Sequence, residues 1–381
     1  MSWKQLRLDE MGEVSRGKSK HRPRNDPKLY GGSYPFIQTA DVKNADFYIT
    51  DYRQTYNEVG LAQSKIWPAE TLCITIAANI ADTAILAFPA CFPDSVMGFI
   101  PDTNICSSHY IKYCFDIMQA QCKQISQGTA QDNLSWERLS TIKFFCPPLD
   151  VQKRVTDILS SYDKLIENSR RQIALLEEAA QRLYKEWFVD LRFPGYETTP
   201  IIDGLPEGWR KGKLDEIVEF RRGKTITQNE TLDGDVPVVA GGLKPAYYHA
   251  HANTTSPVIT VSGSGANAGF CRLYTTEIWA SDCSFADSSM TDSLYFAYAS
   301  IKVLSNGFRQ CQRGSAQPHV YPKHVNALDV VIPDGVCLSA FNDAAKALCS
   351  QIGILNERVS AAREARDRLL PKLMSGEIEV G

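Results

Sequence analysis

The chain contains 381 residues, which is long enough for two or three domains. It is 44% hydrophobic and 22% charged with a net charge of −3, a composition typical of globular proteins that does not by itself indicate a nucleic-acid partner. The sequence has no apolar run of about eighteen residues and no apolar N-terminal segment, so it predicts neither a membrane span nor a secretory signal. Its eleven cysteines form no C-x-x-C pair, which disfavours a zinc or redox motif and is typical of the reduced thiols of a cytoplasmic protein.

Residues 1–148 predict a first strand-rich domain. Runs such as TLCITIA (71–77) and AILAFPACF (84–92) are rich in β-branched and aromatic residues, and Gly, Pro, Asn and Asp separate them. Between Ser15 and Tyr30 the segment carries six Lys or Arg residues against one acid, Asp26. A locally basic segment of this kind favours a nucleic-acid contact even though the whole chain is slightly acidic.

Residues 149–189 predict a long helix. Apolar or small residues recur at alternating steps of three and four, which is the pattern of a nearly heptad seam. At about 1.5 Å per residue this helix would be roughly 58 Å long, and a helix of that length needs a partner for its seam. The predicted seam contains Ile158, Tyr162, Leu165, Ser169, Ile173, Leu176, Ala180 and Leu183.

Residues 190–208, which are rich in proline and glycine, predict a linker, and residues 209–335 then repeat the first domain. WKQLRLDEMGEVSRGKS (3–19) aligns without a gap with WRKGKLDEIVEFRRGKT (209–225). QGTAQDNL (127–134) aligns later with RGSAQPHV (313–320). Two matches in the same order indicate an internal duplication.

Residues 336–375 predict a second long helix, whose seam contains Leu348, Ile352, Leu355, Val359, Ala362 and Leu369. Pro371 is expected to end or kink this helix in its last turn, because proline lacks the N–H that an interior helical residue donates. The simplest partner for either seam is the helix of the other copy.

The clearest motif is Arg-Gly-Lys followed by a hydroxyl residue, present as RGKS (16–19) and RGKT (222–225). A phosphate-binding loop would require a glycine at position 218, which is Val218. Arg and Lys could instead contact the phosphates or the guanines of a nucleic acid, and the glycine would allow the turn. The alternative is a solvated turn that only marks the end of a strand, and the sequence does not decide between the two.

Other motifs are weak. SGSGANAG (262–269) approximates a dinucleotide fingerprint, but strand-like residues follow it where a helix is required, so it predicts a tight loop between strands. His249 and His251 lack a third metal ligand with convincing spacing, and no catalytic constellation is apparent. We therefore expect no metal site and no catalytic residues, and a protein that binds or scaffolds.

Several segments together resemble the specificity (S) subunit of type I restriction-modification systems. They are LPEGWRKGKLDEI (205–217), the paired RGKS and RGKT, the GTAQ and GSAQ elements, LYKEWFVDLRFPG (183–195) and LLPKLMSGEIEV (369–380). The resemblance covers essentially the whole chain. It implies an α+β fold with two strand-rich target recognition domains, each followed by a long helix, and with the two helices pairing as an antiparallel coiled coil.

The resemblance also implies partners. These are double-stranded DNA, two methyltransferase (modification) subunits, and translocase/nuclease (restriction) subunits, with no membrane partner. S-adenosylmethionine, ATP and Mg²⁺ would belong to the partner subunits, so that this chain binds no cofactor and is not itself an enzyme. Because the two copies differ in length and in their loops, we expect an asymmetric, bipartite DNA site. The competing class is a non-DNA adaptor with duplicated protein-binding domains.

The residues that we predict to contact DNA are the basic and polar side chains of the Arg-Gly-Lys elements and of the loops around them. In the first domain they are Arg16, Lys18, Lys20, Arg22, Arg24 and Asn79, and in the second they are Arg221, Arg222, Lys224, Thr225, Ser264, Asn267, Arg309, Gln312 and Arg313.

Overall fold

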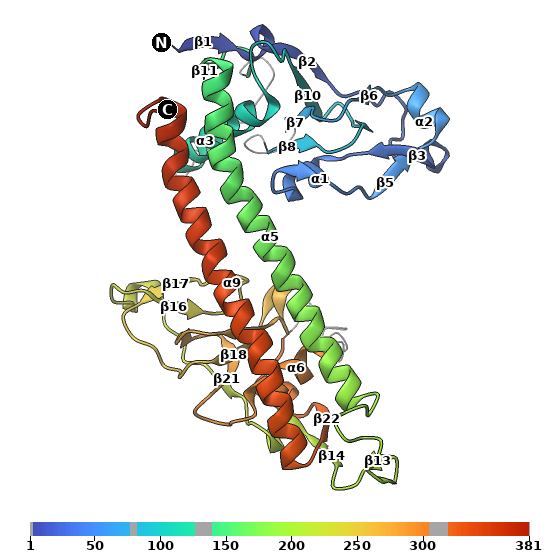
Figure 1. Cartoon of the computed structure of the whole chain (residues 1–381), viewed down its shortest axis with the longest axis vertical. Coiled ribbons are helices and arrows are strands. Elements are labelled where there is room, and N and C mark those ends of the chain that lie inside the picture. Colours follow the sequence, from blue (N-terminus) through green and yellow to red (C-terminus); the bar gives the residue numbers. More distant parts are fainter. Residues whose placement is uncertain (1–2, 77–81, 126–138, 305–318, 381) are drawn as a thin grey trace. The chain divides into compact units, whose positions relative to one another are not determined.

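A computed structural model describes residues 3–76, 82–125, 139–304 and 319–380 (Figure 1). The chain divides into two compact units. Unit 1 contains Met1–Ile166 together with Ser360–Gly381, and unit 2 contains Glu167–Val359. Within the described ranges no helix is both long and apolar enough to cross a membrane.

The described residues of unit 1 form three sheets. A two-stranded sheet pairs β1 (Lys4–Arg7) with β11 (Lys143–Cys146), and a five-stranded sheet has the order β2-β10-β7-β8-β4. A four-stranded sheet has the order β5-β3-β9-β6. The larger sheets contain β2 (Gly12–Arg16), β10 (Val96–Pro101), β7 (Leu72–Thr75), β8 (Thr83–Leu86), β4 (Tyr48–Ile49), β5 (Gln54–Tyr56), β3 (Tyr30–Phe36), β9 (Ala90–Cys91) and β6 (Ile66–Trp67). The described part of this unit also contains α1 (Thr39–Asn44), α2 (Glu58–Ala62) and α3 (Ser108–Ile125), which precede the long helix.

Unit 2 repeats this plan. Here β14 (Arg210–Lys213) pairs with β22 (Asp329–Ile332), a four-stranded sheet has the order β15-β21-β18-β19, and a three-stranded sheet has the order β17-β16-β20. Their strands are β15 (Arg221–Arg222), β21 (Cys283–Asp287), β18 (Val258–Ser262), β19 (Cys271–Tyr274), β17 (Tyr247–His249), β16 (Val236–Val239) and β20 (Trp279–Ala280). The short helices are α6 (Leu294–Leu304) and α8 (Pro322–Asn326), and the predicted linker forms the hairpin β12 (Ile201–Ile202) and β13 (Leu205–Pro206). The matching strand orders agree with the duplication that the sequence indicates.

One repeated sequence has a clear local cause. The LDE triplets form equivalent 3-10 turns at Leu8–Glu10 and Leu214–Glu216. In each turn the glutamate accepts a hydrogen bond from the backbone N–H three residues earlier, at 2.6 Å in unit 1 and 2.8 Å in unit 2. The carboxylate thus satisfies a donor that the turn itself leaves unpaired, which favours retention of glutamate at both positions.

Two long helices, α5 (Leu149–Phe188) and α9 (Gly335–Ser375), pair within each unit. In unit 1, Val155 and Leu159 of α5 share a core with Leu370 and Met374 of α9. In unit 2 the shared core contains Tyr184, Trp187 and Phe188 of α5 with Cys337, Phe341 and Ala345 of α9. Residue numbers rise along α5 as they fall along α9, so the pairing is antiparallel, and the predicted fold class is confirmed.

The predicted phase of the α5 seam is wrong. Leu159 and Ile166 are buried in α5, whereas the predicted seam residues Ile158 and Leu165 are 37% and 39% exposed, so the seam lies one residue further on in this part of the helix. Pro371 was expected to end or kink α9 in its last turn, and the helix continues for four residues past it, to Ser375. Residues next to this proline on the helix, such as Leu370 and Leu373, are buried in the core of unit 1, and this packing holds the last turn.

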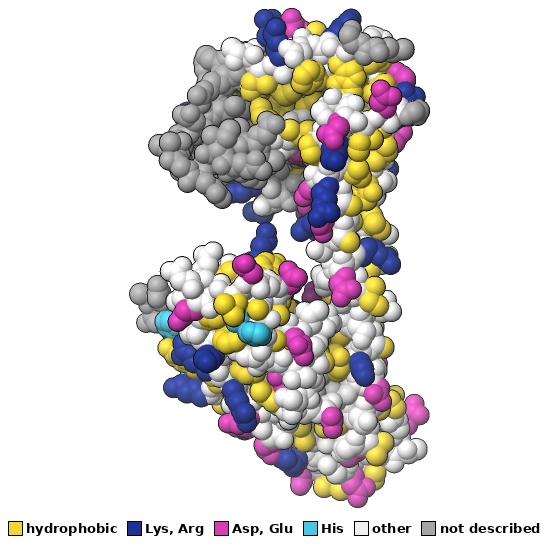
Figure 2. Space-filling model, turned by 90° about the vertical axis from the view of Figure 1, so that its left-hand side faces the viewer, with side chains coloured by type: hydrophobic (Ala, Val, Ile, Leu, Met, Phe, Trp, Pro, Cys, Tyr) yellow, Lys and Arg dark blue, Asp and Glu magenta, His cyan; other side chains and the backbone are white. Residues whose placement is uncertain are grey.

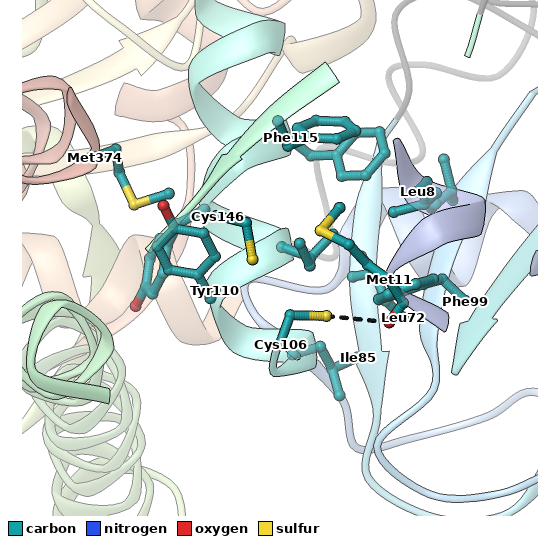
Figure 3. Packing of buried hydrophobic residues seen from close by; sticks show 14 of the residues in the cluster. Leu8, Met11, Leu72, Ile85, Phe99, Cys106, Tyr110, Phe115, Cys146 and Met374 are labelled. Atoms are coloured by element: carbon teal, nitrogen blue, oxygen red, sulfur yellow. Dashed lines mark hydrogen bonds between the residues drawn. The ribbon is translucent and has the colours of Figure 1, made fainter. Parts of the chain in front are cut away.

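The main core of unit 1 lies between its central sheet and the ends of the two long helices (Figure 3). Tyr110 on α3 is fully buried, and its hydroxyl donates to the carbonyl of Phe145 at 2.9 Å. Met374 from the end of α9 points toward the same cluster. The C-terminal end of the chain therefore completes the hydrophobic core of its N-terminal domain.

Candidate nucleic-acid interface

Each Arg-Gly-Lys element leaves its strand and is hydrogen-bonded to a turn before the next strand of the same sheet. In unit 1 the N–H groups of Gly17 and Lys18 donate to the carbonyls of Val96 (2.8 Å) and Phe92 (3.0 Å). In unit 2 the N–H groups of Gly223 and Lys224 donate to the carbonyls of Cys283 and Ala280, both at 2.9 Å. The two elements are structurally equivalent.

The glycine of each element is required by close packing of backbone. A Cβ atom at Gly17 would lie 2.3 Å from the carbonyl oxygen of Pro93, and one at Gly223 would lie 2.3 Å from that of Ser281. Both distances are well inside van der Waals contact, so only glycine fits. Local structure therefore accounts for the repeated glycine, whereas the exposed Arg and Lys side chains beside it have no such structural requirement.

In unit 1 the predicted DNA-contacting cations fall into two groups. Arg16, Lys18 and Lys20 are exposed, and among the described residues no carboxylate lies within ion-pair distance of them. Arg22 and Arg24 both approach Asp94, with Arg22 Nη2 at 3.8 Å from Oδ2 and Arg24 Nη2 hydrogen-bonded to Oδ1. Guanidinium groups that share a carboxylate have a more restricted orientation than free lysines.

The basic segment after β2 is a folded loop. The backbone N–H of His21 donates to the side-chain oxygen of Gln63 at 2.9 Å. Asp26 accepts a hydrogen bond from the backbone N–H of Lys28 at 3.1 Å and also approaches the Lys28 ammonium and the His21 ring. These contacts, led by the Lys28 N–H, lower the pKa of Asp26 to about 2. The loop therefore presents its remaining cations from a defined backbone.

In unit 2 the arginines again have acidic partners. Arg222 Nη2 lies 3.1 Å from Asp282 Oδ1, and Arg221 Nη2 lies 3.7 Å from Glu219 Oε2. Lys224 has no carboxylate partner in the described structure. Its ammonium lies 5.9 Å from the centre of the Trp279 ring, whose Nε1–H donates to the Lys224 carbonyl at 2.7 Å. Thr225 is exposed.

The loop at 262–269 connects the antiparallel strands β18 and β19, as the sequence predicts, and does not open a long helix that could hold a dinucleotide pyrophosphate. Ser264 Oγ donates to Asp282 Oδ2 at 3.2 Å, which brings this residue and Arg222 to one carboxylate. Asn267 is half-buried near the end of the loop. Four predicted contact residues lie outside the described residues: Asn79, Arg309, Gln312 and Arg313.

The histidine pair does not form an apparent metal site. His249 is buried, and its Nδ1 accepts a hydrogen bond from the backbone N–H of Leu232 at 3.0 Å, which engages that nitrogen. Within the described ranges no cluster of three or more His, Cys, Asp or Glu side chains is arranged to hold a metal ion.

Comparisons with known proteins agree with this architecture. Residues 1–178 match the family described as "Type I restriction modification DNA specificity domain". The chain is 25% identical over 410 aligned positions to the type I restriction enzyme MjaIX specificity subunit of Methanocaldococcus jannaschii, and the match covers 99% of this chain and 94% of the relative. Residues 1–178 therefore carry a type I restriction-modification DNA specificity domain, and the chain as a whole is similar to specificity subunits of type I restriction enzymes.

Two further specificity subunits illustrate the range of similarity. The EcoR124I/EcoR124II specificity subunit of Escherichia coli is 24% identical over 176 residues, which cover 42% of this chain and 41% of the relative. A crystal structure of the S subunit from M. genitalium has a TM-score of 0.64 and 16% identity, and the match covers 98% of this chain and 96% of that chain. At this identity the structural similarity supports the shared fold.

Two candidate functional residues were missed from the sequence, namely Asp94 and Asp282. Both lie in the turns to which the Arg-Gly-Lys elements are hydrogen-bonded, and both accept arginine side chains. Each of these acidic residues therefore lies beside basic side chains that we predict to contact DNA. Figure 2 shows Lys and Arg side chains on one face of the molecule, with Asp and Glu side chains among them. The sequence signal that could have found them is an aspartate one or two residues before the strand that pairs with each Arg-Gly-Lys strand, namely Asp94 before β10 and Asp282 before β21.

Proposed function

We propose that the chain is the DNA-specificity subunit of a type I restriction-modification complex, in which each unit recognises one half of a split DNA site. The observation that carries the proposal is the match to a specificity subunit over 99% of the chain, together with two equivalent units that each present an Arg-Gly-Lys element. A chain with two DNA-recognition units can bind a DNA site in two parts, just as a dimeric DNA-binding protein binds two half-sites with its two subunits.

The proposed site is asymmetric, because the two units differ where they present charge. Unit 1 carries a folded basic loop with Arg22 and Arg24, and the sequence of the first copy is longer. Unit 2 instead places Lys224 over Trp279. Two surfaces with different donors are expected to prefer different bases.

The proposed complex also contains two methyltransferase subunits and translocase/nuclease subunits, and it acts on host DNA in the cytoplasm. In this proposal methylation and cleavage, with S-adenosylmethionine, ATP and Mg²⁺, belong to those partners. This chain contributes recognition and assembly, so the purified chain alone is expected to leave DNA unmodified.

The decisive experiment is a map of methylated adenines in the genome that encodes this chain, made with and without an intact copy of its gene. A split motif with a fixed gap that disappears on deletion is the expected result. The purified complex with its methyltransferase partner should then bind a duplex carrying that motif, with an affinity that falls steeply as salt rises. An adaptor that binds only proteins would leave the methylation map unchanged and show no salt-dependent DNA binding.

A second experiment tests the assigned contacts. Charge reversal of Arg16, Lys18, Arg222 and Lys224 together should abolish specific binding, because cations that contact phosphate are replaced by acids. A matched control reverses four exposed cations remote from the Arg-Gly-Lys elements in the sequence, namely Arg182, Arg192, Arg368 and Lys372. Equal losses in both variants would show that only net charge matters and that the contact assignment is wrong.

A further inference from the structure

Asp94 and Asp282 occupy equivalent turns in the two units, although the arginines that reach them come from different parts of the chain. Asp282 accepts Arg222, which belongs to the Arg-Gly-Lys element itself. Asp94 instead accepts a hydrogen bond from Arg24 of the folded loop that follows that element. Arg22 Nη2 lies 3.8 Å from Asp94, and its Nη1 donates to the backbone carbonyls of Ser19 and His21. A carboxylate in the equivalent turn therefore binds an arginine side chain in both units, although the arginine belongs to the following loop in unit 1 and to the Arg-Gly-Lys element in unit 2.

A carboxylate is an unfavourable neighbour for DNA phosphate, so its presence beside the Arg-Gly-Lys element needs a different explanation. The side chains of Asp94 and Asp282 are 42% and 40% exposed, which means that neither pair is a buried structural ion pair. In water-exposed surroundings such a pair adds little to stability. It does, however, restrict the orientation of a guanidinium group and offset part of its charge.

Asp282 is itself held from two sides. Its Oδ1 lies 3.1 Å from Arg222 Nη2, and its Oδ2 accepts a hydrogen bond from Ser264 Oγ at 3.2 Å. Among the described residues no other group engages the Arg222 guanidinium, which leaves its remaining N–H groups available. A planar, pre-oriented donor pair matches O6 and N7 of guanine, the base contact to which arginine is best suited.

We propose that Asp94 and Asp282 are positioning residues that orient Arg24 and Arg222 to read bases, while the lysines of the Arg-Gly-Lys elements contact phosphate. Lys18 and Lys224 have no carboxylate partner in the described structure, so their full charge remains available to the DNA backbone. This inference rests on the proposed function and assigns separate roles to neighbouring cations within it.

The test uses the full chain in complex with its methyltransferase partner. The probe is a library of duplexes in which each position of the motif found by methylation mapping is varied. Asp282→Ala should reduce discrimination about tenfold at one or two positions of a single half-site. The other half-site should be read as in the wild-type complex, and affinity for a non-specific duplex should stay the same or rise because a negative charge is lost. Asp94→Ala should give the same result at the opposite half-site.

Matched variants separate positioning from charge and from stability. Glu219→Ala removes an equally charged and more exposed partner of Arg221, and it should leave the base profile unchanged. Arg222→Lys keeps the charge but loses the planar guanidinium group, so it should alter the base preference at the same positions of the DNA site as Asp282→Ala. It therefore tests the same inference if Asp282→Ala folds poorly. Lys224→Ala should weaken binding to all sequences and lower the salt-dependence slope by about one, with an unchanged base profile.

Any one of three outcomes would overturn the inference. One is an Asp282→Ala complex that loses specific and non-specific affinity equally and keeps the wild-type base profile. Another is an Arg222→Lys complex that keeps the wild-type profile, and the third is a Glu219→Ala complex with a profile change as large as that of Asp282→Ala. A wild-type complex with no preference for any duplex in the library would instead overturn the proposed function itself.

Discussion

Asp163 on α5 and Arg366 on α9 form an ion pair in unit 1, although they lie 203 residues apart in the chain. Arg366 Nη1 is 2.5 Å from Asp163 Oδ1, and the hydroxyl of Tyr113 on α3 donates to Asp163 Oδ2 at 2.6 Å. The Asp163 side chain is only 17% exposed. Three helices from distant parts of the sequence thus meet at one carboxylate, which requires a particular register of α5 against α9.

Arg366→Ala is expected to destabilise the protein by about 1–3 kcal/mol, because it leaves a largely buried carboxylate without its counter-charge. Arg368→Ala is the control, since Arg368 pairs with Glu364 on the same helix where both side chains are mostly exposed. That change should cost less than about 0.5 kcal/mol. Urea unfolding followed by circular dichroism measures both, and equal costs would contradict a specific role for the Asp163 pair.

The protein is expected to lose stability in acid because of Asp334, which lies directly before the first residue of α9. Its Oδ1 accepts the backbone N–H groups of Val336 and Cys337, both at 2.9 Å, and its Oδ2 accepts the indole N–H of Trp209 at 3.0 Å. The Cys337 N–H is the largest cause that lowers the pKa of Asp334, and the Trp209 indole adds to it against the opposing effect of burial. A carboxyl whose pKa is lower in the folded state stabilises the fold above about pH 4 and loses that contribution as the pH falls further.

Asp334→Asn is therefore expected to cost about 1 kcal/mol at neutral pH, and the difference from the wild type should shrink as the pH falls through the folded-state pKa. Urea midpoints measured between neutral pH and about pH 3 test this, because the other carboxylates are common to both proteins. A difference that stays constant over this range would show that the charge of Asp334 does not contribute.

Gly17→Ala and Gly223→Ala should each disrupt the Arg-Gly-Lys element of one unit. The new Cβ would lie 2.3 Å from a backbone carbonyl oxygen, so the strand or the facing turn must move, at a cost of about 1–3 kcal/mol. DNA affinity and thermal unfolding report the change. Gly335→Ala is the control, because a Cβ there meets no atom within 4 Å, and it should behave as the wild type.

Phe341→Ala should be among the most damaging single changes in unit 2. Phe341 is fully buried, and its ring centre lies 4.9 Å from that of Phe188 and 5.6 Å from that of Trp187. Removal of such a ring is expected to cost about 3–5 kcal/mol in denaturant unfolding. Val336→Ala on the same helix should change stability by less than about 0.5 kcal/mol, since Val336 is 83% exposed.

The duplication was predictable because the repeated residues carry backbone requirements. Glu10 and Glu216 cap equivalent turns, and Gly17 and Gly223 allow equivalent close approaches of backbone, so these identities persist while the loops between them differ. The phase of the α5 seam was harder to predict. Ile158 and Leu159 are both apolar, and only packing against α9 decides that Leu159 is buried.

The acidic residues of the candidate interface were not predictable from local sequence. Arg24 and Asp94 are 70 residues apart, and Arg222 and Asp282 are 60 apart, so each pair exists only after the sheets have formed. A charge pattern read along the chain identified the arginines but not the carboxylates that orient them. The proposed division between base-reading arginines and phosphate-binding lysines depends on these long-range pairs.

The contribution of Leu370, Leu373 and Met374 to the core of unit 1 has a consequence for synthesis of the chain. A ribosome that has completed residue 166 must still add more than two hundred residues before these side chains exist. At about 5–20 residues per second this takes roughly ten to forty seconds. During that interval the nascent N-terminal domain lacks part of its hydrophobic core, so the domain that is made first is the last to be completed.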